Sequence, residues 1–337
     1  MSESTSNRRP RTVHTLTRQS GSASRLRPAV SELLDTLAEG LEGHRLGNTV
    51  IVETAHCPCR IVAQPVWTPT PDGAVVAETV TVMTDIDPAA SLPKHTEGHV
   101  NRFAALSAVV RELDTDALRL VSRVSLYEGW EQSLPLYWAL LFAAACLHDE
   151  GLIAAAEALF PPEGVGVCPP KDIGGDVAAR GWRVEDWEGL QAALQEREMA
   201  VSVGAHGLAA SLPWRWCGLS ATDAEEAAFL SFRADMPHLR LGLGLFFSLE
   251  LPTVFSKSGA AELANWLNLL EWEELDAPPF LGAWCLQLCD TRLAFVGFWP
   301  NRLYRPDALF HITAWMEART ERVRGYLENL LQVTKAQ

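Results

Sequence analysis

Apolar and polar positions along residues 29–86 predict a helix followed by strands. Apolar residues recur at helical spacing from Val30 to Leu41, and Gly43 ends that pattern. Two β-rich stretches follow at 49–66 and 74–86, separated by the turn-forming segment TPTPDG. We expect these two stretches to form neighbouring antiparallel strands.

The next part of the pattern predicts a second helix, a further strand and a third helix. The apolar face of the second helix would consist of Val100, Phe103, Leu106, Val110 and Leu113. Apolar residues then occupy alternate positions from Leu118 to Leu126, as in a half-buried strand whose other face carries Arg119 and Arg123. A very apolar segment from about Leu134 to Phe160 predicts the third helix.

The same order of elements returns in the second half of the chain. Its predicted elements are a helix at 187–197, a β-rich stretch at 200–214, a strand with apolar residues at every second position from Leu239 to Leu251, a helix at 263–270, a hairpin at 281–299 and a helix from about Pro306 to Leu331. We therefore predict an internal duplication and an α+β fold of two tandem domains. Each domain would be a twisted antiparallel sheet packed with helices in the order helix, strands, helix, strands, helix.

Length and composition agree with two folded domains. The chain has 337 residues, of which 48% are hydrophobic, and this is enough for two substantial cores. We place the first domain at 28–160 and the second at 182–337, with a linker rich in Gly and Pro at 161–181. Residues 1–27 contain six arginines, one acidic residue and almost no large apolar side chain, which predicts a disordered basic tail.

The net charge, the lengths of the apolar runs and the cysteine content indicate which partners the protein can bind and in which cellular compartment it is found. The net charge of −14 opposes attraction to nucleic acid or to an anionic membrane and favours a basic partner. Nucleic acid would be held only through the basic tail. The longest apolar run, 134–147, is shorter than the roughly 18 residues of a membrane span. Seven cysteines lie mostly in apolar patterns, as expected for reduced thiols in a cytoplasmic protein.

The segment KHTEGH at 94–99 contains two candidate metal ligands. His95 and His99 would share one face of a helix, as the histidines of zinc proteases do. However, Gly98 interrupts that helical turn, and Glu97 stands one position too late for the zinc-protease motif. These departures make a zinc site the less favoured interpretation.

The segment HCPCR at 56–60 offers a second candidate set. His56, Cys57 and Cys59 are soft ligands close together, but no second pair with the spacing of a zinc knuckle occurs elsewhere. A turn between strands with incidental thiols is the favoured interpretation. We predict no cofactor, and we keep a metal-dependent enzyme that uses His95 and His99, or this set, as the alternative function.

The remaining motifs favour binding over catalysis. Gly242 and Gly244 lie inside a predicted strand, so they are not a dinucleotide fingerprint and are expected to allow close approach of another segment. His148 and the two acidic residues after it spread around a helix, which favours a solvated face. The sequence shows no nucleophile elbow, phosphate loop or paired carboxylates. We therefore predict a non-catalytic protein.

Aromatic residues of the second half are the candidate partner-binding residues. The chain contains twelve tryptophans, and an antiparallel sheet with helices on one face leaves its other face for a partner to cover. Large aromatic side chains supply contact area at such surfaces. The residues predicted to bind another protein or a peptide segment are Trp214, Trp216, Trp284, Trp299 and Tyr304.

The order of elements resembles that of the type III secretion chaperone-like superfamily, including the bacterial sensory transduction regulator (YbjN-like) proteins. The resemblance is carried by NRFAALSAVVRELDTDALRLVSRVSLYEG with the apolar helix after it, and by ELANWLNLLEWEEL followed by LGAWCLQLCDTRLAFVGFW. It implies compact α+β domains and an adaptor or chaperone role in which paired domains hold segments of client proteins. The two fused halves would then form such a pair within one chain. No functional residue is carried over.

Overall fold

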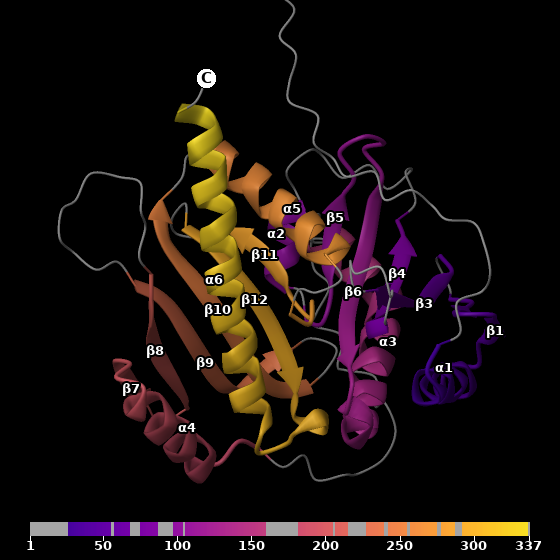
Figure 1. The fold of residues 1–337 in the computed structure, drawn as a ribbon, viewed down its shortest axis with the longest axis horizontal. Coiled ribbons are helices and arrows are strands. Elements are labelled where there is room, and N and C mark those ends of the chain that lie inside the picture. Colours follow the sequence, from indigo (N-terminus) through magenta and orange to yellow (C-terminus); the bar gives the residue numbers. More distant parts are fainter. Residues whose placement is uncertain are drawn as a thin grey trace, which may run out of the picture.

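Two antiparallel sheets with helices make up the described part of the protein (Figure 1). The structure is a computed structural model that describes residues 26–54, 57–67, 75–86, 97–103, 105–159, 181–204, 206–214, 227–238, 242–254, 257–274, 278–286 and 292–335. The predicted α+β class is confirmed. Most of the predicted tail and linker lies outside these ranges. No described helix combines the length and apolar character needed to cross a membrane.

The first sheet has the strand order β1-β2-β3-β4-β6-β5. The elements of this half are α1 (Pro28–Gly40), β1 (His44–Leu46), β2 (Thr49–Val52), β3 (Cys59–Trp67), β4 (Val75–Asp85), α2 (Glu97–Val100), the 3₁₀ turn η1 (Asn101–Phe103), β5 (Ala108–Arg111), β6 (Leu118–Tyr127), η2 (Trp130–Ser133) and α3 (Leu134–Leu159). A proline in the first turn favours the start of α1. Helices α1 and α3 contact each other and pack on this sheet.

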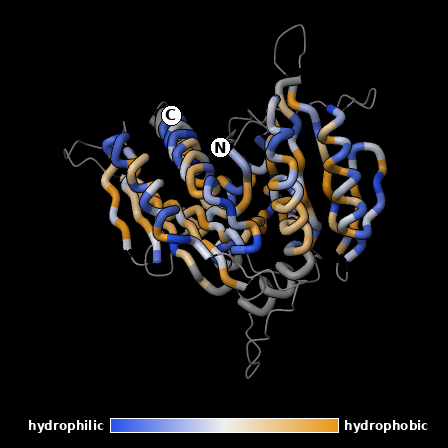
Figure 2. Tube along the Cα trace, turned by 90° about the horizontal axis from the view of Figure 1, so that it is seen from below, coloured by the Kyte–Doolittle hydropathy of each residue, from blue (hydrophilic) through white to orange (hydrophobic). Residues whose placement is uncertain are grey.

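The second sheet has the order β11-β12-β10-β9-β8-β7. Its half contains α4 (Val184–Glu196), β7 (Val201–Gly204), β8 (Gly207–Pro213), β9 (Ala227–His238), β10 (Gly242–Val254), α5 (Lys257–Glu273), β11 (Ala283–Leu286), β12 (Arg292–Pro300), η3 (Asn301–Leu303) and α6 (Ala308–Lys335). Helices α4 and α6 contact each other and pack on this sheet. Figure 2 shows hydrophobic and hydrophilic colours alternating along the strands and along α6, as expected for elements with one buried face.

Corresponding strands of the two sheets have the same neighbours and the same register. Read from β7 to β11, the second order repeats the first with each strand replaced by its counterpart. In the inner hairpins, Ala108 pairs with Val121 and Ala283 pairs with Val296. Positions at the same offset from these pairs are therefore equivalent in the two halves.

Two sequence-based predictions of elements were wrong. The second helix was predicted to reach Leu113, but it ends at Val100, and Val110 lies in strand β5. The side-chain amide of Asn101 bonds both backbone groups of Val109, at 2.9 and 2.7 Å, which holds this segment as a strand edge. Strand β9 was not predicted, although its core-facing residues alternate from Ala228 to Ala234.

Candidate functional site

The aromatic residues predicted to bind a partner lie mostly in the core. The side chains of Trp214, Trp284 and Trp299 are at most 1% exposed, so they cannot contact a partner at the surface of this structure. Tyr304 is half-buried, and its hydroxyl donates to Asp186 at 2.9 Å. Trp216 lies outside the described residues. The structure therefore does not bring these five residues together as a surface.

The candidate metal ligands are only partly described. His56 and His95 lie outside the described ranges, and His99 lies in α2 with its side chain not described. Cys59 is buried at the start of β3, and Cys57 is partly buried. Within the described residues, no three His, Cys, Asp or Glu side chains gather closely enough to hold a metal ion.

The sequence predicted that His148 lies on a solvated helix face, and this prediction was wrong. Its side chain is fully buried and bonds the hydroxyls of Thr84 at 3.1 Å and Ser122 at 3.2 Å. Burial lowers the pKa of His148 to about 3, so the imidazole is neutral at physiological pH. Burial also raises the pKa of the Cys285 thiol to about 12, which keeps it protonated and a poor nucleophile. Both groups are structural.

The two halves meet through equivalent backbone contacts. Arg123 exchanges backbone hydrogen bonds with Phe280 at 3.1 and 2.7 Å, and the N–H of Phe298 donates to the carbonyl of Ala105 at 3.1 Å. Arg123 and Phe298 are equivalent in the two hairpins, as are Ala105 and Phe280. The halves are therefore related by an approximate two-fold axis at this interface.

Side chains cover the inner sheet edges, β5 and β11. On β5, the amide of Asn265 from α5 accepts from the N–H of Arg111 at 2.9 Å and donates to its carbonyl at 3.0 Å. On β11, Asn268 bonds both backbone groups of Trp284, and the guanidinium of Arg102 donates to the carbonyl of Leu286. These edges are not open to a further strand.

A buried ionic network lies between the halves. The guanidinium of Arg319 pairs with the carboxylate of Glu271 at 2.7 Å, and both side chains are at most 1% exposed. The indole N–H of Trp284 donates to the same carboxylate at 2.6 Å. From the first sheet, Arg123 donates to the carbonyls of Glu271 at 3.2 Å and Pro278 at 3.1 Å. Arg123 was predicted to be on an exposed face, but the second half covers that face.

The outer edges, β1 and β7, differ in their protection. Strand β1 carries Arg45, whose guanidinium donates to Asp35 and to the carbonyl of Gly47 at 2.9 Å. Charged edge residues of this kind discourage pairing with another strand. Strand β7 has the sequence VSVG, without charge or proline, and three of its four residues are exposed.

The backbone of β7 presents hydrogen-bonding groups that no described residue uses. The N–H of Ser211 in β8 donates to the carbonyl of Ala200 at 2.9 Å. Antiparallel strands bond through alternate residues, so Ser202 and Gly204 also bond β8, whereas the backbone groups of Val201 and Val203 point away from it. A further extended segment has these groups available for pairing.

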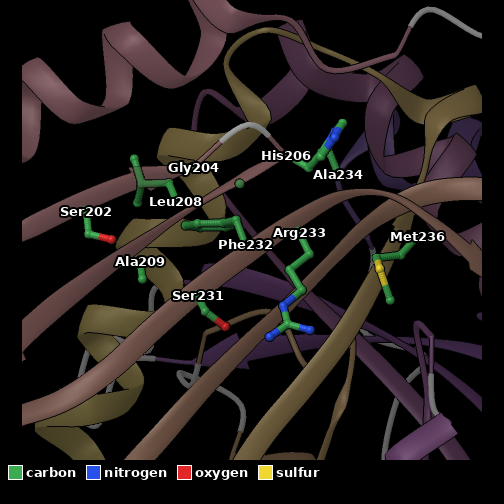
Figure 3. A pocket seen from close by; sticks show the side chains of 11 residues that line it. Ser202, Gly204, His206, Leu208, Ala209, Ser231, Phe232, Arg233, Ala234 and Met236 are labelled. Atoms are coloured by element: carbon green, nitrogen blue, oxygen red, sulfur yellow. The ribbon is translucent and has the colours of Figure 1, made fainter.

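A shallow depression of about 360 Å³ adjoins this edge, on the sheet face opposite α4 and α6 (Figure 3). Its floor consists of small residues on β7, β8 and β9: Ser202, Gly204, Gly207, Ala209 and Ser231. Arg233 and Met236 stand at one end. Phe229, which lies on the same face of β9, is 46% exposed. An edge, an open floor and exposed apolar side chains thus lie together.

This surface was not among the sites predicted from the sequence. Arg233 and Phe229 lie on β9, which was not predicted, and the short β7 was read only as part of a β-rich stretch. The alternation from Ala228 to Ala234 is the signal that places Arg233 and Phe229 on the outer face.

Comparisons of the chain with protein-family models, with curated proteins and with solved structures found no match.

Proposed function

We propose that this protein is a non-catalytic adaptor or chaperone-like protein of the cytoplasm that binds an extended segment of another protein along β7. The observation that carries the proposal is the unprotected edge of β7 beside an open depression. An extended segment would pair its backbone with Val201 and Val203 and would place alternate side chains over the floor of the depression.

The pairing of the halves supports a binding role. We propose that each half is a chaperone-like α+β domain with the order helix, strands, helix, strands, helix, and that the chain arose by duplication. The amides of Asn265 and Asn268 bond the backbone of the inner edges β5 and β11, and the charged Arg45 lies on the outer edge β1. This leaves β7 as the outer edge that carries no such protection within the described residues.

Site-specific photo-crosslinking in the native cells tests this proposal. A photoreactive phenylalanine analogue at Phe229 should capture a protein partner, because this side chain is 46% exposed beside the depression. The same analogue at Leu113, which is 75% exposed in the first half, is the matched control and should not capture that partner.

The variant Val203→Pro tests whether crosslinking from position 229 requires pairing of the partner with the edge of β7. Proline removes an N–H that points away from β8, so the internal ladder is kept while the edge loses a donor. We expect the crosslink from position 229 to fall at least tenfold, with an unchanged circular dichroism spectrum. Equal crosslinking from positions 113 and 229, or an undiminished yield in the folded proline variant, would refute the proposal.

A further inference from the structure

We propose that the segment bound along β7 carries a glutamate whose carboxylate pairs with Arg233, so that this surface selects acidic strands. The inference rests on the proposed function, since it names the chemistry of the bound segment. It depends on the position of Arg233 relative to Gly204, Gly207 and the free edge of β7.

Arg233 has an open path across the sheet toward β7. Gly204 of β7 pairs with Gly207 of β8, and Gly207 pairs with Arg233 of β9, so the three residues form one row across the outer face. A Cβ at Gly207 would lie 2.1 Å from the carbonyl oxygen of Phe232, which excludes any larger residue there. The row therefore has no side chain between Arg233 and the edge.

Arg233 lacks a counter-charge in the described part of the chain. It is exposed and forms no ion pair with a described residue. The depression is otherwise lined by small or apolar side chains and by His206, and it contains no acidic residue. A carboxylate from outside would find a cation whose charge no described residue neutralises. The local charge is thus opposite to the net charge of −14.

Distances across the sheet favour glutamate. An added strand would place its Cα atoms about 14 Å from that of Arg233, which is three strand spacings of ~4.8 Å. With bonds of about 1.5 Å, an extended arginine spans about 7 Å and glutamate about 5 Å, and a hydrogen bond adds about 3 Å. With the Arg233 side chain turned toward β7, glutamate therefore spans the distance to the guanidinium with about 1 Å to spare, and aspartate, which is one bond shorter, has no such margin.

Binding of synthetic strands to the full chain tests this inference. The probe is a fluorescent nonapeptide, Thr-Val-Thr-Val-Glu-Val-Thr-Val-Thr, which places valines on one face and the central glutamate on the other. Peptides with Gln, Asp or Lys at the centre are the comparison set, and fluorescence anisotropy gives each affinity. We expect the Glu peptide to bind about tenfold more tightly than the Gln peptide, because charge-assisted pairs are the stronger hydrogen bonds.

Charge reversal assigns the preference to one side chain. Arg233→Glu should remove the preference for the Glu peptide and make the Lys peptide the tighter ligand. Arg183→Glu is the matched control, because it makes the same change in charge at an exposed position outside the depression. Arg183 directly precedes the first turn of α4, where an acidic side chain is favourable for the helix. This control should leave all affinities within twofold of the wild-type values.

The outcomes separate the inference from the function on which it rests. Equal affinity for the Glu and Gln peptides, or a Glu preference that survives Arg233→Glu, overturns the inference. If Val203→Pro still abolishes the binding of every peptide in that case, the proposed function stands. If no peptide binds the wild-type chain more tightly than it binds the proline variant, both are overturned.

Discussion

Removing the charge of Glu271 should destabilise the protein more than removing the charge of Arg123, although both belong to one buried network. Glu271 is the carboxylate of this network, and it pairs with Arg319 at 2.7 Å. In Glu271→Gln, the guanidinium groups of Arg123 and Arg319 would remain buried with no counter-charge from the network. Breaking a buried pair by neutralising one partner costs about 3–5 kcal/mol, and we expect a loss of this size.

Arg123→Met should cost much less, because two effects oppose each other. Burial lowers the pKa of Arg123 from 12.5 to about 10, so keeping it charged in the fold costs roughly 3 kcal/mol at neutral pH. Methionine removes that cost. It also removes three hydrogen bonds, to two carbonyls and to the hydroxyl of Ser125, which at about 1.5 kcal/mol each, the lower value for bonds to a charged group, contribute about 4–5 kcal/mol. The expected net loss is about 1 kcal/mol.

Urea unfolding followed by tryptophan fluorescence and far-UV circular dichroism measures these losses. Glu262→Gln is the matched control, because it makes the same chemical change on the same helix at an exposed position. It should change the free energy of unfolding by less than about 0.5 kcal/mol. The reasoning fails if Glu271→Gln costs no more than Glu262→Gln, or if Arg123→Met is the more damaging change.

Two further predictions concern a buried histidine and a close strand contact. The pKa of His148 is about 3 in the fold against about 6.5 when unfolded, so below pH 6.5 the unfolded state binds the extra proton and stability falls. His148→Gln should abolish roughly 2 kcal/mol of the loss between pH 6.5 and 5, as measured by urea unfolding at both pH values, and an unchanged pH dependence would contradict this. In Gly244→Ala, the new Cβ would lie 2.4 Å from Phe298 and 2.6 Å from the carbonyl oxygen of Trp299, at a cost of about 1–3 kcal/mol. Gly325→Ala on α6, where no atom beyond the adjacent residues and the backbone of the helix itself lies within 4 Å of the new Cβ, should instead stabilise by about 0.5–1 kcal/mol. Thermal unfolding of both variants gives the signs, and equal shifts would refute the close contact.

The spacing of apolar residues correctly predicted helices and strands that bury one apolar face. The alternation around Gly242–Val254 and the helical spacing from Val30 to Leu37 both correspond to observed elements with the expected core residues. Gly244 also allows the close approach that its place in the strand suggested. These signals depend on neighbours close in sequence, so they can be read without the fold.

Contacts between distant parts of the chain explain what periodicity missed. Arg123 alternates with apolar neighbours as an exposed residue would, and only the packing of α5 and residues 278–280 against it makes it buried. The apolar spacing from Val100 to Val110 matches a helix, but the Asn101 amide holds Val109 in a strand. Trp284 packs in the core against Phe295, and its buried indole N–H is satisfied by Glu271, which accepts it at 2.6 Å. Residue type alone does not reveal such partners.

The two outer edges show how a fused pair differs from a pair of identical subunits. In a symmetric dimer both outer edges carry the same residues, so one change in sequence opens or closes both. Here Arg45 is the second residue of β1, and its side chain reaches α1, where it donates to the carbonyl of Ser31 at 2.9 Å. The equivalent position of β7, counted back from the same two-residue hairpin turn, is Val203. A protected edge and an open edge can therefore coexist in one chain, and the open edge would receive one segment per chain rather than two.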